Sequence, residues 1–195
     1  MASFNVNQVI KKVAEAPKTR RSAEAAQRRE FNIQKSIMLQ DFDNHPVTQE
    51  LKNYNNNPDA GSNFTNRGNL FSFFGFPAGS DPTNIIGKIL NNNTSIQFNN
   101  KVITKTKIRF NFKISFPIEQ IRAATPLPFS TRSWVSAIEK GLSNFSHYVF
   151  SSKFEKSNKS RSKRGIQSKT VRLGGSMKPI SYLTEIFNNF KNSFR

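Results

Sequence analysis

The sequence predicts an α+β protein with an N-terminal helical arm over residues 1–43 and a small domain over residues 44–195. The domain is expected to contain an antiparallel sheet built around a long hairpin. Two or three helices, including a C-terminal amphipathic helix, are expected to flank the sheet. Three observations predict this class: helical spacing of apolar residues at both ends of the chain, strict alternation over residues 106–117, and Asn-, Gly- and Pro-rich segments between these patterns.

The arm is predicted to contain a short amphipathic helix over residues 1–16, which Pro17 ends, and a second helix that Ser22 caps and that runs to about Asp43. The first half of the second helix is polar almost all round, so a core of its own chain is not expected to hold it. We expect it to project into solvent or to lie on another subunit. The start of the arm is expected to become ordered only in an assembly.

An irregular apolar segment, "LFSFFGFPAGSDP" (70–82), follows one helical turn predicted at residues 45–51 and a loop predicted over residues 52–69. Gly75 and Pro77 interrupt its large apolar residues, which makes it too irregular for a helix. The segment is either an apolar plug in the domain's own core or an exposed anchor for a neighbouring subunit. The candidate anchor residues are Phe71, Phe73, Phe74 and Phe76.

Next comes a helix that Asp81 is expected to cap and that runs to Leu90, and the hairpin follows it. The first strand of the hairpin is short, and the turn is predicted near Asn99 and Asn100. The second strand is "TKIRFNFKISFP" (106–117), in which apolar even positions alternate with polar or basic odd positions. This alternation indicates a strand with one dry face and one wet face.

The second half of the domain is predicted to contain three helices, over residues 117–128, over residues 131–149 and, capped by Ser181, at the C-terminus. Gly141 lies inside the second helix, where it indicates either close packing or a break. Residues 151–172 carry eight Lys or Arg and one Glu, so they are interpreted as a basic loop or an extended hairpin.

The composition points to partners rather than to catalysis. Thirty Lys and Arg against 12 Asp and Glu give a net charge of +18, which favours nucleic acid, an acidic membrane surface or acidic protein faces as partners. There is no Cys, no membrane-spanning apolar stretch and no spacing typical of a metal site. The acids are scattered, and His45 and His147 are interpreted as ordinary polar residues. The chain is therefore expected to be no enzyme and to need no cofactor.

Two groups of basic residues are the candidate functional site. Alternation places one row on the wet face of the hairpin, about 6–7 Å apart, where it is expected to line a DNA channel or meet an acidic face of a neighbour. This row consists of Lys101, Lys105, Lys107, Arg109 and Lys113. The basic loop either tracks a phosphate backbone nonspecifically or is simply solvated. Its candidate residues are Lys153, Arg161, Lys163, Arg164, Lys169 and Arg172.

Three segments resemble virion structural proteins of tailed bacteriophages: "GNLFSFFGFPAGSDPTNII" (68–86), "ATPLPFSTRSWVSAIEKGLSNF" (124–145) and "RSKRGIQSKTVRLGGSMKPISYLTEIF" (161–187). The chain is similar over about residues 45–195 to small neck, tail-completion and tail-terminator proteins of contractile-tailed phages. The resemblance implies an α+β subunit of a ring, commonly sixfold, between portal and tail, with a sheet shared around the ring. It also implies a core position for Trp134 and no catalytic residues.

The partners that the resemblance implies are copies of the chain itself, portal or adaptor, neck or tail proteins, and nonspecifically bound genomic DNA. The implied location is the virion, assembled in the host cytoplasm, with no membrane partner. Two other interpretations stay open. The chain is either a nonspecific nucleic-acid-binding protein, or another virion part such as a head-decorating or baseplate protein.

Overall fold

The computed structural model confirms the α+β class and describes residues 6–53, 70–104, 107–128, 130–143, 148–150, 165–167 and 176–194. The helices are α1 (Val6–Glu15), α2 (Pro17–Asn44), α3 (Pro46–Asn53), α4 (Leu70–Phe74), α5 (Asn84–Asn93), α6 (Ile118–Ala124), α7 (Trp134–Lys140) and α8 (Leu183–Asn192). The strands are β1 (Ser95–Ile103), β2 (Ile108–Ser115), β3 (Pro126–Leu127), β4 (Ser130–Ser133), β5 (Leu142–Ser143), β6 (Tyr148–Phe150), β7 (Gly165–Gln167) and β8 (Ser176–Met177). All strand pairs are antiparallel: β1–β2, β3–β4, β5–β8 and β6–β7.

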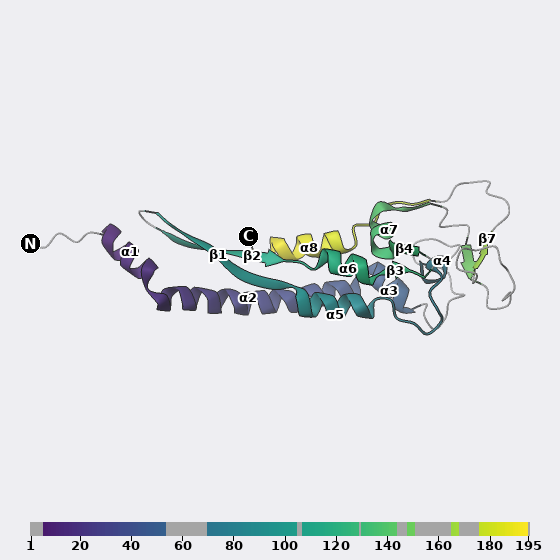
Figure 1. Cartoon of the computed structure of the whole chain (residues 1–195), viewed down its shortest axis with the longest axis horizontal. Coiled ribbons are helices and arrows are strands. Elements are labelled where there is room, and N and C mark those ends of the chain that lie inside the picture. The colour runs from purple at the N-terminus through teal and green to yellow at the C-terminus, as the bar shows by residue number, and fades with distance from the viewer. Residues whose placement is uncertain are drawn as a thin grey trace, which may run out of the picture.

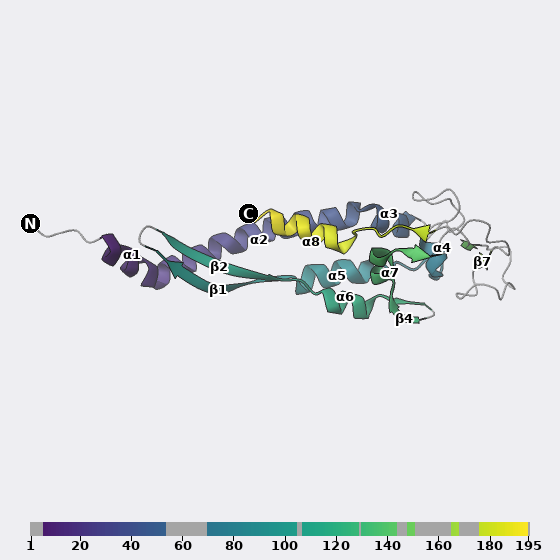
Figure 2. The same ribbon diagram turned by 90° about the horizontal axis from the view of Figure 1, so that it is seen from above.

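The molecule is elongated, with α2 and the β1–β2 hairpin lying side by side along its length (Figures 1 and 2). At one end, α1 lies beside the tip of the hairpin. Toward the other end, α3, α4, α6 and α7 lie near the C-terminal end of α2 and the N-terminal end of α5. We call α1, the first half of α2 (residues 17–30) and the hairpin (residues 95–115) the projection, and we call the other described elements the body.

The long helix α2 ends near Asp43 as predicted but begins earlier than predicted. The first helix ends at Glu15, before Pro17, as predicted. Pro17 itself occupies the first turn of α2, where its missing N–H is tolerated, so Ser22 lies inside α2 and does not cap it. The second half of α2 buries Phe31, Met38 and Phe42 in the main core. The predicted boundary after residue 43 therefore runs through one continuous core.

The core lies in the body and is rich in aromatic side chains. Trp134 is buried as the resemblance implied, and its ring lies close to those of Phe74, Phe76 and Tyr182. The helix α8 contributes its predicted apolar face, which consists of Leu183, Ile186, Phe187 and Phe190. Side chains of α2, α4, α7 and α8 thereby form one core, which joins the N-terminal helix α2 to the C-terminal helix α8.

The phenylalanine segment forms part of this core. Residues 70–74 form the short helix α4 despite the irregular pattern, and Gly75, with φ of 70°, turns the chain after it. Phe71, Phe74 and Phe76 are fully or almost fully buried, and Phe73 packs partly buried against the same cluster. The exposed-anchor interpretation is thus wrong for the three buried rings, because the chain's own core already covers them.

The hairpin turns later than predicted. β1 continues to Ile103, and Thr104 and Lys107 are joined across the turn by a backbone hydrogen bond of 2.8 Å from the Thr104 N–H to the Lys107 carbonyl. The predicted turn at Asn99 and Asn100 is instead a register shift in β1, since Phe98 pairs with Phe112 but Asn100 pairs with Asn111. One extra residue therefore stands in β1 at this point, as in a β-bulge.

The later helices are shorter than the sequence indicates. The helix predicted over residues 131–149 ends at Lys140, because Gly141 adopts φ of 87° and its N–H bonds to the Ile138 carbonyl. Ser181 does not cap the last helix. Instead, Glu139 of α7 accepts hydrogen bonds from the backbone N–H and the hydroxyl of Thr184 at 2.9 and 3.0 Å.

Two shorter predictions are confirmed, since α3 and α6 form where a helical turn and a short helix were expected. The next predicted helix also forms, but α5 begins at Asn84 and runs to Asn93 rather than ending at Leu90. Asp81 does not adjoin its first turn, but it accepts hydrogen bonds from the backbone N–H groups of Thr83 and Asn84. Ile85 is exposed, because it is the Ile86 and Leu90 side of α5 that meets the core.

Candidate functional site

The candidate site is the face of the hairpin that points away from α2, which we call the outer face. In an antiparallel pair, directly opposed residues share a face, so the register assigns each residue to one side. The outer face consists of Gln97, Asn100, Val102, Arg109, Asn111 and Lys113. Arg109 and Lys113 are exposed as predicted, and Lys107 is exposed at the turn. The alternation over residues 106–117 therefore predicted the basic side of β2 correctly.

The opposite side of the hairpin, its inner face, rests on the polar first half of α2. It carries Phe98, Phe110 and Phe112, whose rings lie close together, with centroids 5.9 Å apart for Phe98 and Phe112. The Arg20 guanidinium lies 4.3 Å above the Phe98 ring and forms an ion pair with Glu24 at 2.7 Å. Cation–π contacts and long aliphatic stems thus let a polar helix cover aromatic residues.

The sequence expectation for this helix was therefore wrong in one respect. The first half of α2 packs against the chain's own hairpin. The sequence had predicted that it would project into solvent or lie on another subunit. The contact leaves an open groove of about 220 Å³ between α2 and the inner face, lined by residues that include Arg28, Gln27 and Ile96. The projection is consequently held by a few aromatic and cationic contacts rather than by a packed core.

Lys101 does not belong to the basic row. The extra residue in β1 turns Lys101 to the inner face, opposite Phe110. Its Nζ donates a hydrogen bond of 3.0 Å to the Ala14 carbonyl in the last turn of α1. A cation at this end of a helix satisfies a free carbonyl and complements the helix dipole. Lys101 therefore fixes α1 against the hairpin.

The other predicted basic residues lie outside the described residues. This holds for Lys105 and for the candidates of the basic loop: Lys153, Arg161, Lys163, Arg164, Lys169 and Arg172. The strand β7, which pairs with β6, is the described part of the predicted extended hairpin in this region. The described site thus consists of the hairpin's outer face alone.

Several basic residues that single-strand alternation cannot assign also lie on the projection. Lys18, Arg21, Arg28 and Arg29 of α2 are exposed, whereas Lys35 points inward. The Lys35 Nζ donates to the Thr94 carbonyl at 3.3 Å, and burial lowers the pKa of this ammonium group. The helical periodicity of residues 17–35 was the sequence signal that could have separated the exposed basic residues from the inward-pointing Lys35.

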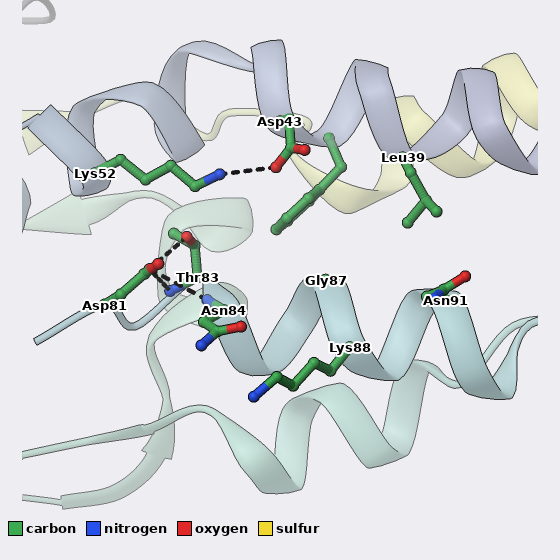
Figure 3. A pocket seen from close by; sticks show the side chains of 10 residues that line it. Leu39, Asp43, Lys52, Asp81, Thr83, Asn84, Gly87, Lys88 and Asn91 are labelled. Atoms are coloured by element: carbon green, nitrogen blue, oxygen red, sulfur yellow. Dashed lines mark hydrogen bonds and ion pairs between the residues drawn. The ribbon is translucent and has the colours of Figure 1, made fainter.

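An open groove of about 330 Å³ lies in the body between α2, α3 and α5 (Figure 3). Its two carboxylates are already engaged: Asp43 pairs with the Lys52 ammonium at 2.8 Å, and Asp81 accepts from Thr83 and Asn84. Figure 3 shows no interaction between the Lys88 side chain and either carboxylate. The groove therefore presents no carboxylate poised as a base beside a nucleophile.

A histidine and a tyrosine meet at the junction of α3 and α8. The Nδ1 atom of His45 accepts a hydrogen bond from the Val47 N–H at 3.2 Å, so His45 caps α3. The His45 ring lies 4.7 Å from the buried Tyr182 ring. Burial lowers the pKa of His45, while Glu185 and a backbone hydrogen bond at Ser181 oppose this shift. The neutral imidazole is thus the form that the fold favours.

This cap predicts a pH dependence of stability. Since the pKa of His45 is lowered from its ordinary value of 6.5, the unfolded state binds its proton more readily than the folded state. The contribution of His45 is fully present above pH 6.5 and is lost as the pH falls below that value. We therefore expect the melting temperature to decrease between about pH 7.5 and about pH 5.5.

The variant His45→Asn is the matched control, because asparagine keeps an N-cap acceptor but does not titrate in this range. The decrease in melting temperature over the same pH range is expected to be smaller in His45→Asn than in the native chain. An identical pH profile in both proteins would show that His45 does not carry the effect.

Within the described part of the chain, no group of three or more His, Asp or Glu residues is arranged to hold a metal ion. No described helix has the length and apolarity needed to cross a membrane. Comparison of the chain with protein-family models, curated proteins and solved structures found no significant match. The argument for function therefore depends on the geometry and charge of this chain.

Proposed function

We propose that the chain is a structural subunit of a tailed-phage virion that forms a ring at the neck or head–tail junction through contacts with its own copies. The resemblance of three segments to neck, tail-completion and tail-terminator proteins suggests this role. The observation that supports it best is that α1 and α2, which extend along the elongated molecule, leave aliphatic side chains outside the chain's core. The chain acts as a building block and not as an enzyme.

Four of the exposed aliphatic residues in the described structure lie on α1 and α2, in pairs at helical spacing. Val9 and Val13 of α1 are 41% and 46% exposed, and Ile33 and Ile37 of α2 are 57% and 43% exposed. Pairs of this kind form an apolar stripe that a neighbouring protein covers in an assembly. Both edges of the two-stranded hairpin are also without a further strand in the described structure, so a neighbour's hairpin has room to pair with them.

The ring is tested with the purified full chain by mass photometry and negative-stain electron microscopy. Closed rings of uniform size are expected, and the variant Ile33→Glu/Ile37→Glu is expected to shift the mass distribution towards the monomer by about tenfold in the assembly constant or more. The matched control is Ile85→Glu/Ile118→Glu, which places the same charges on exposed isoleucines of α5 and α6.

A monomer under all conditions, or equal loss of assembly in the two variants, would contradict the proposal. Mass spectrometry of purified virions with crosslinking then identifies the component and its neighbours. Recovery of the chain in the particle together with portal or tail proteins is expected. Its absence from complete particles would exclude the virion role.

A further inference from the structure

The outer face of the hairpin is a cationic surface with no negative charge of its own. Residues 95–115 contain five Lys or Arg and no Asp or Glu. Among the described residues, Lys107, Arg109 and Lys113 form no ion pair, and all three are exposed. Uncompensated cations on a ribbon that extends from the body attract a polyanion.

The spacing on this face fits a phosphate backbone. Arg109 and Lys113 are four residues apart on one strand, so their Cα atoms are about 13 Å from each other. Between them the Asn111 side chain donates to the Asn100 side chain at 2.6 Å, which leaves the second Asn111 amide proton and the Asn100 amide group for a ligand. Cations separated by amides match the groups that contact phosphate and sugar oxygens.

The neighbouring helix adds positive charge to the same projection. Residues 6–30 contain seven Lys or Arg and three acids. Glu24 is paired with Arg20, and Glu30 accepts a hydrogen bond from Gln34 at 2.8 Å. Cations outnumber acids by four in this segment, so it reinforces the positive field of the hairpin rather than cancels it.

We propose that the outer face of the hairpin binds the phosphate backbone of duplex DNA without sequence preference. A duplex is favoured over a single strand because Phe98, Phe110 and Phe112 all lie on the inner face, so the outer face offers no stacking platform. An acidic protein face is a poorer fit, since Val102 is the one apolar residue on the outer face and protein interfaces are centred on aromatic and aliphatic anchors. A two-stranded ribbon is also narrow enough to enter the major groove.

The proposal does not depend on ring formation and is tested on the full chain with a fluorescein-labelled duplex of about 30 base pairs and arbitrary sequence, by fluorescence anisotropy over a salt series. The variant Lys107→Gln/Arg109→Gln/Lys113→Gln is compared with Lys88→Gln/Arg132→Gln/Lys140→Gln. Both variants lose two Lys and one Arg at exposed positions, so their net charge is the same. Circular dichroism confirms that each variant is folded.

The outer-face variant is expected to bind about tenfold more weakly or worse, and the slope of log K against log salt is expected to become shallower by about 2–3. The body variant is expected to stay within about twofold of the native chain. Equal losses in the two variants, or no binding by the native chain, would overturn the proposal. Competition by poly-L-glutamate as strong as that by unlabelled duplex would also overturn it, because the partner would then be an acidic protein face.

Discussion

Replacing Phe74 by alanine is expected to lower the free energy of unfolding by about 3–5 kcal/mol. The Phe74 ring is 1% exposed, and its centroid lies 5.4 Å from that of Phe73, 5.8 Å from that of Phe76 and 6.2 Å from that of Trp134. Removal of the ring leaves a cavity at the centre of an aromatic cluster whose members come from two distant segments. Chemical denaturation of the purified chain measures the loss.

Phe73→Ala is the matched control, because it removes the same ring from the adjacent position, where the side chain is only partly buried. Its expected cost is about 1–2 kcal/mol. The pair distinguishes the two interpretations of the phenylalanine segment. If this segment were an anchor for a neighbour, Phe74→Ala would impair assembly while the single chain kept its native stability.

The helices that the sequence predicted well are those whose burial follows local spacing. In α8, the residues at positions i, i+3, i+4 and i+7 from Leu183 are the ones that the structure buries. The segment 70–74 shows the limit of this reasoning, because neighbours far along the chain, such as Trp134, decide its burial. Periodicity within five residues contains no information about those neighbours.

The basic residues of the hairpin's outer face could be predicted only in part, because the pairing between the two strands is not visible in the sequence. Strict alternation assigned Arg109 and Lys113 correctly, but it could not assign Lys101, which lies beyond the extra residue of β1. Because side chains in a strand alternate with a period of two, one inserted residue moves every following side chain to the other face. The Asn99–Asn100 pair signalled an irregularity there, and only the pairing with β2 shows that it is a bulge and not a turn.

The polar half of α2 shows why an absent apolar stripe does not exclude packing within the chain. Arg20 covers Phe98 with its guanidinium and satisfies its charge with Glu24. Arg20 and Phe98 are 78 positions apart in the sequence. Their contact therefore depends on the direction in which the hairpin leaves α5. Long cationic side chains therefore belong among the candidates for covering an aromatic face.

Replacing Tyr182 by alanine is expected to destabilise the chain by about 3–5 kcal/mol, because this residue joins α8 to both α2 and α3. The Tyr182 ring is fully buried, and its centroid lies 6.1 Å from that of Phe42 and 6.3 Å from that of Trp134. Its hydroxyl forms a hydrogen bond of 2.6 Å with the buried hydroxyl of Thr48. Burial raises the pKa of Tyr182, so the hydroxyl stays protonated and able to donate.

The hydroxyl and the ring contribute separately, and a double-mutant cycle separates them. Tyr182→Phe keeps the ring but leaves the Thr48 hydroxyl buried without this partner, which is expected to cost about 1–2 kcal/mol, and Thr48→Val is expected to cost a similar amount. In Tyr182→Phe/Thr48→Val both polar groups are absent and the shapes are kept, so the double variant is expected to lose less than the sum of the single variants. Strict additivity in urea denaturation would mean that the two hydroxyls do not depend on each other, and the polar contact between the first 50 residues and α8 would then have no role in stability.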